Sequence, residues 1–357
     1  MPTHLLQSIL KKYSLDIKNC TIEPFGSGLI NHTWVVKNGD ETYILQKIND
    51  TVFKNPKDIE RNIQLIDNYL HIRFPDYYFV SPIENTEGGQ MVYDPEKGYF
   101  RLFPFVQNSH SKNVVETPEQ AYEAAAQFGK FTRVLADFDA TQLHDGIPDF
   151  HNLTLRNTQF MIATQEGNSQ RIKEAEADID TLFYLQDIAL QYELILQNPN
   201  FKKRVTHHDT KISNVLFGNE DKALCVIDLD TTMAGYFISD VGDMMRTYLS
   251  PVSEEEEDFS KIEVRDDFYK AIVKGYSEQM ETVLSAEEKA HFFYAGKFMI
   301  YMQALRFLTD YLNNDVYYGA KYPTHNLVRA RNQIVLLKQL IARSYLRNET
   351  GIKAPNL

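Results

Sequence analysis

The stretch VTHHDTKISNVLFGNEDKALCVIDLDTT, residues 205–232, constrains this chain more than any other. It contains two short runs of aliphatic, β-branched or aromatic residues, VLF at 215–217 and LCVI at 224–227. The segment GNED between them has the composition of a turn. Two such runs joined by a turn predict a β-hairpin. Because a hairpin brings its two ends together, the polar residues that flank the strands are expected to lie close to one another.

Three side chains that carry oxygen stand at these ends. Asp209 and Asn214 precede the first strand, and Asp228 follows the second. Ligands of this kind suit Mg²⁺, which holds phosphate oxygens while it keeps much of its water. The order His207-x-Asp209-x₄-Asn214 is the catalytic-loop pattern of kinases, and Lys211 stands where it can reach a transferred phosphate. A lone aspartate beside a turn is more often a cap or an Asx-turn, but the ordered set is far more specific.

VTHHDTKISN and CVIDLDTT together resemble the aminoglycoside phosphotransferase and choline kinase family. The likeness extends to YILQKINDTVFKNP (43–56), YFRLFPF (99–105) and ALRFLTDYLNNDVYY (304–318). It implies an α+β, two-lobed protein-kinase-like fold, with a small β-rich N-terminal lobe (1–105) that binds nucleotide. A larger, mainly helical C-terminal lobe (106–357) would carry catalysis and substrate binding.

The resemblance implies ATP and Mg²⁺ as cofactors, with Asp209 as the catalytic base. Lys211 would balance phosphate charge, and Asn214 and Asp228 would bind the metal. Within the family, the chain is most similar to the kinases that phosphorylate N-acetylglucosamine or N-acetylgalactosamine at the anomeric hydroxyl.

Residues 21–25, 33–37 and 41–48 are predicted as the first three strands, and a glycine-containing turn follows the first of them. Backbone amides of a loop such as Gly26-Ser27-Gly28 can approach phosphates, although a G-x-G turn is common in any β protein. In the resembling family this loop covers the nucleotide, and Asn31 and His32 point toward the acceptor substrate.

The third strand of a kinase is expected to carry a lysine that binds the α- and β-phosphates. Here Gln46 has the inward position and Lys47 is its neighbour, and adjacent strand residues face opposite sides. Either the register shifts so that Lys47 binds phosphate, or Gln46 replaces the ion pair with hydrogen bonds. The resemblance implies that Glu60, in a helix predicted for residues 56–74, orients the lysine. The alternative is a solvated glutamate in the first turn of that helix.

Residues 80–83, 90–93 and 99–105 are predicted as further strands, the last leading into the connector between the lobes. In the resembling family the connector binds adenine, and Phe103 and Phe105 would sandwich the ring. The alternative is that both phenylalanines are plain core.

The chain beyond the connector predicts helices, which cover residues 117–138, 150–165, 174–197, 238 onward, 285–312 and 326–347. Asp240, Asp243 and Arg246 share one helix face and suggest an ion-paired helix that supports the catalytic loop. The run Glu254–Asp258 suggests a solvated, mobile loop.

One arginine continues an apolar stripe on the helix predicted for residues 285–312. Arg306 can pair with Asp310 one turn further on, whereas the resemblance places it in the sugar site. Thr231 and Tyr317 are expected at the same site.

The formal net charge of −12 argues against general affinity for nucleic acid or anionic membranes. No apolar run approaches the length of a membrane span, and the N-terminus has no signal-peptide core. Only Cys20 and Cys225 occur, which fits a reducing compartment. We expect a cytoplasmic monomer or weak dimer whose partners are small molecules.

Three alternatives stay open. The first is a kinase of another alcohol or amine, such as choline, homoserine or an aminoglycoside, which would need a carboxylate-lined pocket. The second is a non-catalytic nucleotide or sugar sensor, suggested by Gln46. The third is a metal-dependent hydrolase built on His207, His208 and Asp209, although no further histidine is suitably spaced.

Overall fold

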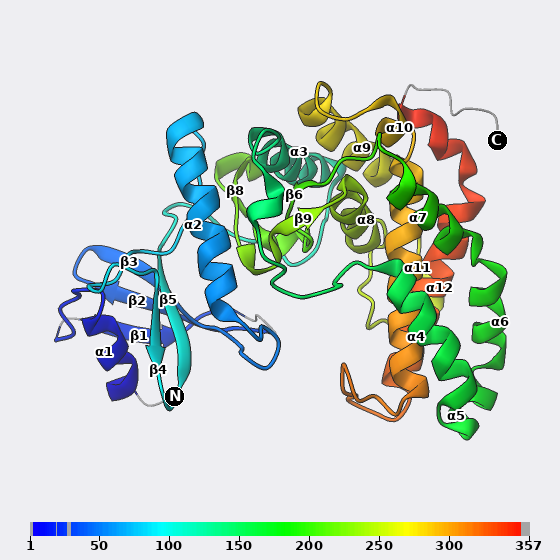
Figure 1. Cartoon of the computed structure of the whole chain (residues 1–357), viewed down its shortest axis with the longest axis horizontal. Helices are drawn as coiled ribbons and strands as arrows, with labels where there is room; N and C mark the ends of the chain where they lie inside the picture. Colours follow the sequence, from blue (N-terminus) through cyan, green and yellow to red (C-terminus); the bar gives the residue numbers. More distant parts are fainter. Residues whose placement is uncertain (1–2, 19, 27–29, 351–357) are drawn as a thin grey trace.

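The computed structural model describes residues 3–18, 20–26 and 30–350. The chain forms a small N-terminal part built on one sheet and a larger, mainly helical C-terminal part (Figure 1). This arrangement confirms the two-lobed α+β architecture predicted from the sequence. The last strand of the sheet ends at Pro104, and the first helix of the C-terminal part begins at Pro118. The predicted boundary after residue 105 falls between them and stays a prediction.

The N-terminal sheet pairs its strands in the order β1-β2-β3-β5-β4, all antiparallel. Side chains along a strand alternate between the two faces of a sheet. One face packs on helix α1 (Thr3–Lys11) through Leu10, Trp34 and Leu45. The other face, which carries Ile44 and Gln46, is turned toward the C-terminal part. The strands are β1 Cys20–Pro24, β2 His32–Asn38, β3 Glu41–Lys47, β4 Met91–Asp94 and β5 Gly98–Pro104.

Helix α2 (Pro56–Arg73) lies between β3 and β4 in the sequence and packs against the C-terminal part. It confirms the helix predicted for residues 56–74. Its buried apolar residues recur every three or four positions and join the core of the C-terminal part. The Asn62 side chain donates to the backbone carbonyls of His144 and Thr232, at 2.7 and 3.2 Å. These contacts fasten the helix to the C-terminal part beside the catalytic hairpin.

The C-terminal part is organised around helix α11 (Phe292–Leu312), which is almost entirely buried. It packs against α8 (Phe237–Tyr248), α12 (His325–Ala342) and α4 (Leu153–Glu166). Gly242 allows α8 to approach α11 closely, because a Cβ at position 242 would lie 2.4 Å from the carbonyl oxygen of Ala295. The remaining helices are α3 Pro118–Val134, α5 Ser169–Glu174, α6 Glu176–Tyr184, α7 Asp187–Gln197, α9 Asp266–Met280 and α10 Ala286–Lys289.

Residues 204–235 form two short antiparallel ladders beside these helices. Strand β7 (Val215–Phe217) pairs with β8 (Ala223–Val226), which confirms the predicted hairpin. Strand β6 (Arg204–Thr206) pairs with β9 (Met233–Gly235). The segments before and after the hairpin therefore lie next to each other.

Three predicted elements differ from the structure. Residues 80–83 form no strand: only Ile83 N–H bonds to β5, at the Leu102 carbonyl oxygen, and Pro82 has no N–H to donate. The helix predicted for residues 174–197 is divided between α6 and α7, and the helix predicted for residues 285–312 is divided between α10 and α11. A hydrophobic period of 3.6 residues continues through such breaks, so it cannot show where a helix changes direction.

No helix among the described residues is both long enough and apolar enough to cross a membrane.

Candidate active site

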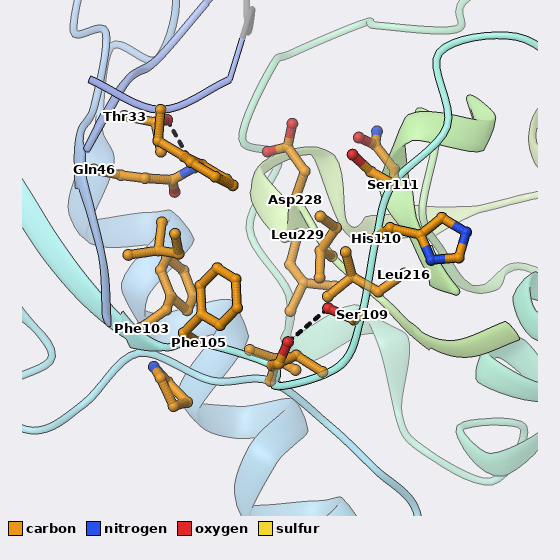
Figure 2. A pocket seen from close by; sticks show the side chains of 17 residues that line it. Thr33, Gln46, Phe103, Phe105, Ser109, His110, Ser111, Leu216, Asp228 and Leu229 are labelled. Atoms are coloured by element: carbon orange, nitrogen blue, oxygen red, sulfur yellow. Dashed lines mark hydrogen bonds between the residues drawn. The ribbon is translucent and has the colours of Figure 1, made fainter. Parts of the chain in front are cut away.

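A cavity of about 220 Å³ lies between the N-terminal sheet and the β7–β8 hairpin (Figure 2). One end is apolar, and its wall includes Phe103 and Phe105 beside the connector, as the sequence suggested. The other end is polar and is lined by Gln46, Asn214 and Asp228. Other lining side chains are Phe25, Thr33, Ile44, Val80, Leu216 and Ile227. The cavity thus has an apolar end next to a cluster of polar groups.

Helix α8 holds the catalytic loop through its carboxylates. Asp240 accepts hydrogen bonds from the backbone N–H groups of His207 and His208, at 3.0 and 2.8 Å. Asp243 accepts from Thr210 N–H at 2.9 Å, and its other oxygen is held by Arg246. The suggested role of α8 as an ion-paired support for the catalytic loop is therefore confirmed.

Both histidines of the motif are buried and used internally. The His207 Nε2 lies 2.9 Å from the Ile227 carbonyl oxygen, and its Nδ1 accepts from Asp209 N–H at 3.4 Å. The His208 ring contacts Thr206 and His151. Burial lowers the pKa of both rings, that of His208 to about 3, so both are neutral near pH 7. This geometry argues against the hydrolase alternative, because all four ring nitrogens already have partners.

The Asp209 carboxylate lies 3.2 Å from the Lys211 ammonium. Burial raises the pKa of Asp209, but the charge and hydrogen bond of Lys211 together with the effects of His207 and Arg246 outweigh burial, and the net pKa lies below the ordinary value. Lys211 keeps about half of its side chain exposed, and the neighbouring Asp209 raises its pKa. Near neutral pH the pair is thus a carboxylate beside an ammonium, as a proton acceptor and a phosphate-binding cation require.

Asn214 and Asp228 face the same polar end of the cavity. The Asn214 amide nitrogen donates to the Asp209 carbonyl at 2.9 Å, so its side-chain oxygen is the atom left for a cation. Limited hydration inside the cleft, together with Asp230 and Asp209, raises the pKa of Asp228 to about 7. A raised carboxyl pKa means that a nearby positive charge would be strongly favoured. One carboxylate and one amide oxygen fit Mg²⁺ that shares its remaining ligands with phosphates and water.

Asp230 and Thr231, which follow Asp228 closely, are used inside the fold. Asp230 forms a fully buried ion pair with Arg101 of β5 and accepts from the Asn31 side chain at 2.8 Å. The Thr231 hydroxyl donates to the His207 carbonyl at 2.7 Å. Asn31 and Thr231 therefore brace the catalytic hairpin, and their predicted substrate contacts stay predictions.

Sequence reasoning missed Arg101. The only signal for it is one charged residue inside the aromatic run YFRLFPF.

The predicted phosphate-binding residues divide into two groups. Gln46 lines the cavity, whereas Lys47, its neighbour on β3, does not. The Glu60 carboxylate accepts hydrogen bonds from the backbone N–H groups of Gln90 and Met91, at 2.7 and 2.8 Å. Glu60 therefore anchors the turn before β4, a contact that the sequence did not suggest. Gly26 has φ +75°, which favours glycine, and Ser27 and Gly28 lie outside the described residues.

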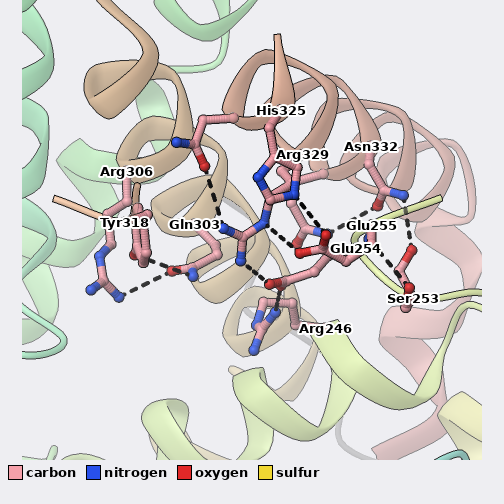
Figure 3. Close-up of polar contacts among 12 residues, drawn as sticks. Arg246, Ser253, Glu254, Glu255, Gln303, Arg306, Tyr318, His325, Arg329 and Asn332 are labelled. Carbon is pink, nitrogen blue, oxygen red and sulfur yellow. Dashed lines mark hydrogen bonds and ion pairs between the residues drawn. The ribbon is translucent and has the colours of Figure 1, made fainter. Parts of the chain in front are cut away.

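Arg306 lies among aromatic rings of the C-terminal part. Its guanidinium donates to the Gln303 side chain at 3.1 Å (Figure 3). It also donates to the Tyr317 hydroxyl at 3.4 Å. Arg306 does not form an ion pair with Asp310. The Asp310 carboxylate accepts hydrogen bonds from the backbone N–H groups of Tyr317 and Tyr318 instead. The guanidinium also lies 5.6 Å from the centre of the Phe150 ring.

Stacked rings connect Arg306 to the catalytic loop. Phe150 stacks on His151 with ring centres 4.4 Å apart, and His151 Nδ1 lies 3.2 Å from His208 Nδ1. A series of side-chain contacts thus leads from Tyr317 and Arg306 through Phe150 and His151 to His208, the residue before Asp209. His32 is exposed at the start of β2.

The acidic run at residues 254–258 is the solvated loop that its composition suggests only at Glu257 and Asp258, which are exposed. Glu254 forms ion pairs with Arg246 of α8, at 2.5 Å, and with Arg329 of α12 (Figure 3). Glu255 pairs with His325 and Lys321 at 2.6 and 2.9 Å. The run therefore straps α8 to α12, because two helices supply cations that the sequence pattern could not locate.

Comparisons with known proteins agree with this geometry. Residues 21–283 match the model of the phosphotransferase enzyme family. A spectinomycin phosphotransferase solved with ADP and spectinomycin is 13% identical, with a TM-score of 0.61 over 96% of this chain and 98% of that chain. A microcompartment-associated aminopropanol kinase is 17% identical, with a TM-score of 0.65 over 99% of each chain. The choline kinase of Cryptosporidium parvum is 14% identical, with a TM-score of 0.54 over 96% and 98%. At such identities the structures establish the fold, and they confirm the kinase-like architecture predicted from the sequence.

Proposed function

Because this chain belongs to the phosphotransferase enzyme family, we propose that it transfers the γ-phosphoryl group of ATP to the anomeric hydroxyl of an N-acetylhexosamine, as an N-acetylhexosamine 1-kinase. The observation that carries the proposal is that Asn214 and Asp228 line the polar end of a cavity whose other end is aromatic, while Asn214 is bonded to the backbone carbonyl of Asp209. Adenine would occupy the slot beside Phe103 and Phe105, and the phosphates would extend toward Asp228.

Each polar residue of the site has a defined task. Asn214 and Asp228 would hold Mg²⁺, which neutralises phosphate charge when it is bound. Asp209 accepts the proton of the acceptor hydroxyl while the hydroxyl oxygen attacks the γ-phosphorus. The bond from the γ-phosphorus to the bridging oxygen of ADP breaks in the same displacement. Lys211 keeps Asp209 ionised and offers positive charge to the phosphoryl group. Most of the acceleration would come from positioning and charge stabilisation.

The proposed acceptor site, which includes Arg306 and Tyr317, favours a neutral substrate. Arg306 contributes a cation and Tyr317 a hydroxyl, and both are suited to the hydroxyl and acetamido groups of a sugar. A cationic amine would be repelled by Arg306. The proposed acceptor contacts are Arg306 and Tyr317 from the C-terminal part, His32 and Asn31 from the N-terminal part, and Thr231.

A second candidate is a kinase of an amino alcohol. Spectinomycin, aminopropanol and choline are named for solved structures of the same fold. Two carboxylates near the site already have partners, since Asp230 pairs with Arg101 and Glu254 pairs with Arg246 and Arg329. We therefore keep the sugar as the proposed acceptor.

The direct test is ADP release from Mg²⁺-ATP with a panel of N-acetylglucosamine, N-acetylgalactosamine, plain hexoses, choline and an aminoglycoside. We expect turnover with the N-acetylhexosamines and a product that is stable to alkali and labile to acid, as a sugar 1-phosphate is. The Asp209→Asn variant should bind Mg²⁺-ATP and lose turnover. Turnover with amines alone would exclude the sugar assignment, and nucleotide binding without turnover on any acceptor would favour the sensor alternative.

A further inference from the structure

One rung of the N-terminal sheet places three polar side chains next to one another. Thr33 of β2 is in register with Gln46 of β3, and Gln46 is in register with Arg101 of β5. The next rung, Trp34, Leu45 and Leu102, belongs to the apolar cluster on the opposite face. The polar rung therefore faces the cleft, and Thr33 and Gln46 line the cavity there.

Arg101 is fully buried and is held between two acceptors. Its Nε and Nη2 atoms donate to the Gln46 side-chain oxygen, at 3.1 and 2.9 Å. Its Nη1 faces the Asp230 carboxylate. A guanidinium can only donate hydrogen bonds, so the oxygen of the Gln46 amide has to face Arg101.

Because the Gln46 amide oxygen faces Arg101, the amide nitrogen faces the opposite way. This nitrogen points to the Thr33 hydroxyl oxygen at 3.4 Å, on the cavity side (Figure 2). The amide nitrogen carries two hydrogens, and the second can be donated to a group that enters the polar end of the cavity. This end also contains Asp228, next to which the phosphates are proposed to lie.

We propose that Arg101 is a positioning residue for nucleotide binding, which holds the Gln46 amide so that its NH₂ group contacts the phosphates of ATP. The proposal rests on the proposed function of the cavity as an ATP site. It also explains why a glutamine stands at position 46. A lysine there would place its ammonium against the buried Arg101 guanidinium, whereas a glutamine accepts from Arg101 and still offers a donor to the ligand.

The ion pair with Asp230 extends the effect of Arg101 to the metal site. Asp230 lies two residues after Asp228, and both follow strand β8. Arg101 therefore ties β5 and the Gln46 amide to the loop that carries Asp228. A single buried cation orients donors on the sheet relative to the carboxylate on the opposite wall.

The first arm of the test compares two neighbouring substitutions of the full chain, Gln46→Met and Lys47→Met, by isothermal titration calorimetry with Mg²⁺-ADP. Loss of a hydrogen bond to a charged group should weaken the Gln46→Met complex by roughly tenfold or more. Lys47→Met removes a full charge on the other face, and its affinity should stay within about twofold of the original chain. Equal affinities for the original chain and Gln46→Met would overturn the proposal.

The second arm measures whether Arg101 acts through Gln46. Arg101→Lys keeps a cation for Asp230 but loses the paired donation to Gln46, so Mg²⁺-ADP affinity should fall several-fold. In the Gln46→Met background the same change should have no further effect, because interacting residues are not additive. An equal loss in both backgrounds, or a lower Tm with unchanged affinity, would mean that Arg101 does not position Gln46.

The two hypotheses fail in different ways. If the original chain binds no adenine nucleotide, the proposed function fails. If it binds Mg²⁺-ADP and Gln46→Met binds equally well, only the positioning role fails. Should Arg101→Lys not fold, the comparison of Gln46→Met with Lys47→Met still decides whether Gln46 contacts the nucleotide.

Discussion

Replacing Glu254 by glutamine tests whether the acidic run is a strap or a solvated loop. The carboxylate lies between the guanidinium groups of Arg246 and Arg329, and about a quarter of its side-chain surface is exposed. Burial raises the pKa of Glu254, but the two arginines outweigh burial and lower it from 4.5 to about 2. Glutamine has nearly the same shape and removes only the charge.

The expected loss of stability follows from this pKa. One pKa unit corresponds to about 1.4 kcal/mol, so a fall from 4.5 to about 2 corresponds to roughly 3 kcal/mol of folding free energy. Partial exposure screens the ion pairs, and we expect roughly 2 to 3 kcal/mol near pH 7. Because the folded-state pKa is the lower one, this stability is fully present above about pH 4.5 and is lost as pH falls through about 2.

The assay is urea denaturation followed by far-UV circular dichroism, since the single tryptophan, Trp34, reports on the N-terminal sheet rather than on the strap. Glu257→Gln is the matched control, because it removes the same charge from an exposed neighbour and should cost less than about 0.5 kcal/mol. The difference between Glu254→Gln and the original chain should shrink as pH falls below 4.5. Equal, small losses for both variants at pH 7 would refute the strap.

Three further substitutions test other parts of the site. Arg306→Ala should raise the KM for the acceptor by about tenfold or more with little change in Tm; a lower Tm with unchanged kinetics would make Arg306 structural. Asp240→Asn should cost about 2 kcal/mol and lower kcat in steady-state assays while Mg²⁺-ADP affinity persists, because one catalytic-loop N–H loses its acceptor; unchanged kcat would contradict this. Gly235→Ala would place a methyl group 2.3 Å from Thr206 Oγ1 and 2.5 Å from His208 Cε1, so thermal denaturation should show at least about 2 kcal/mol of destabilisation; an unchanged Tm would contradict the close packing.

Local patterns in the sequence were sufficient for several parts of the fold. The hairpin at residues 215–226 depends on a turn only a few residues long, so the convergence of Asn214 and Asp228 followed from short-range chemistry. Helix α2 was marked by Pro56 and by apolar residues at a regular spacing. The support of the catalytic loop by α8 followed from one helix face that carries Asp240 and Asp243.

Other features depended on which side of an element faces the cleft. Gln46 and Lys47 are neighbours in the sequence, and only the pairing of β3 with β2 and β5 decides that Gln46 faces the cavity. A register shift of one residue would exchange the two. The hydroxyl of Thr231 was available in the sequence, and its use by the His207 carbonyl appears only in the folded loop.

The sequence by itself determined the kinase-like class, the catalytic hairpin and the residue types at its ends, because these depend on motifs and turns within about thirty residues. The tertiary structure alone decided how the buried charges are used. Arg101 meets Gln46 and Asp230, and Glu254 meets Arg329, across 55, 129 and 75 residues of chain. A charge is stable in a protein interior only beside its partner, and long-range packing chooses that partner.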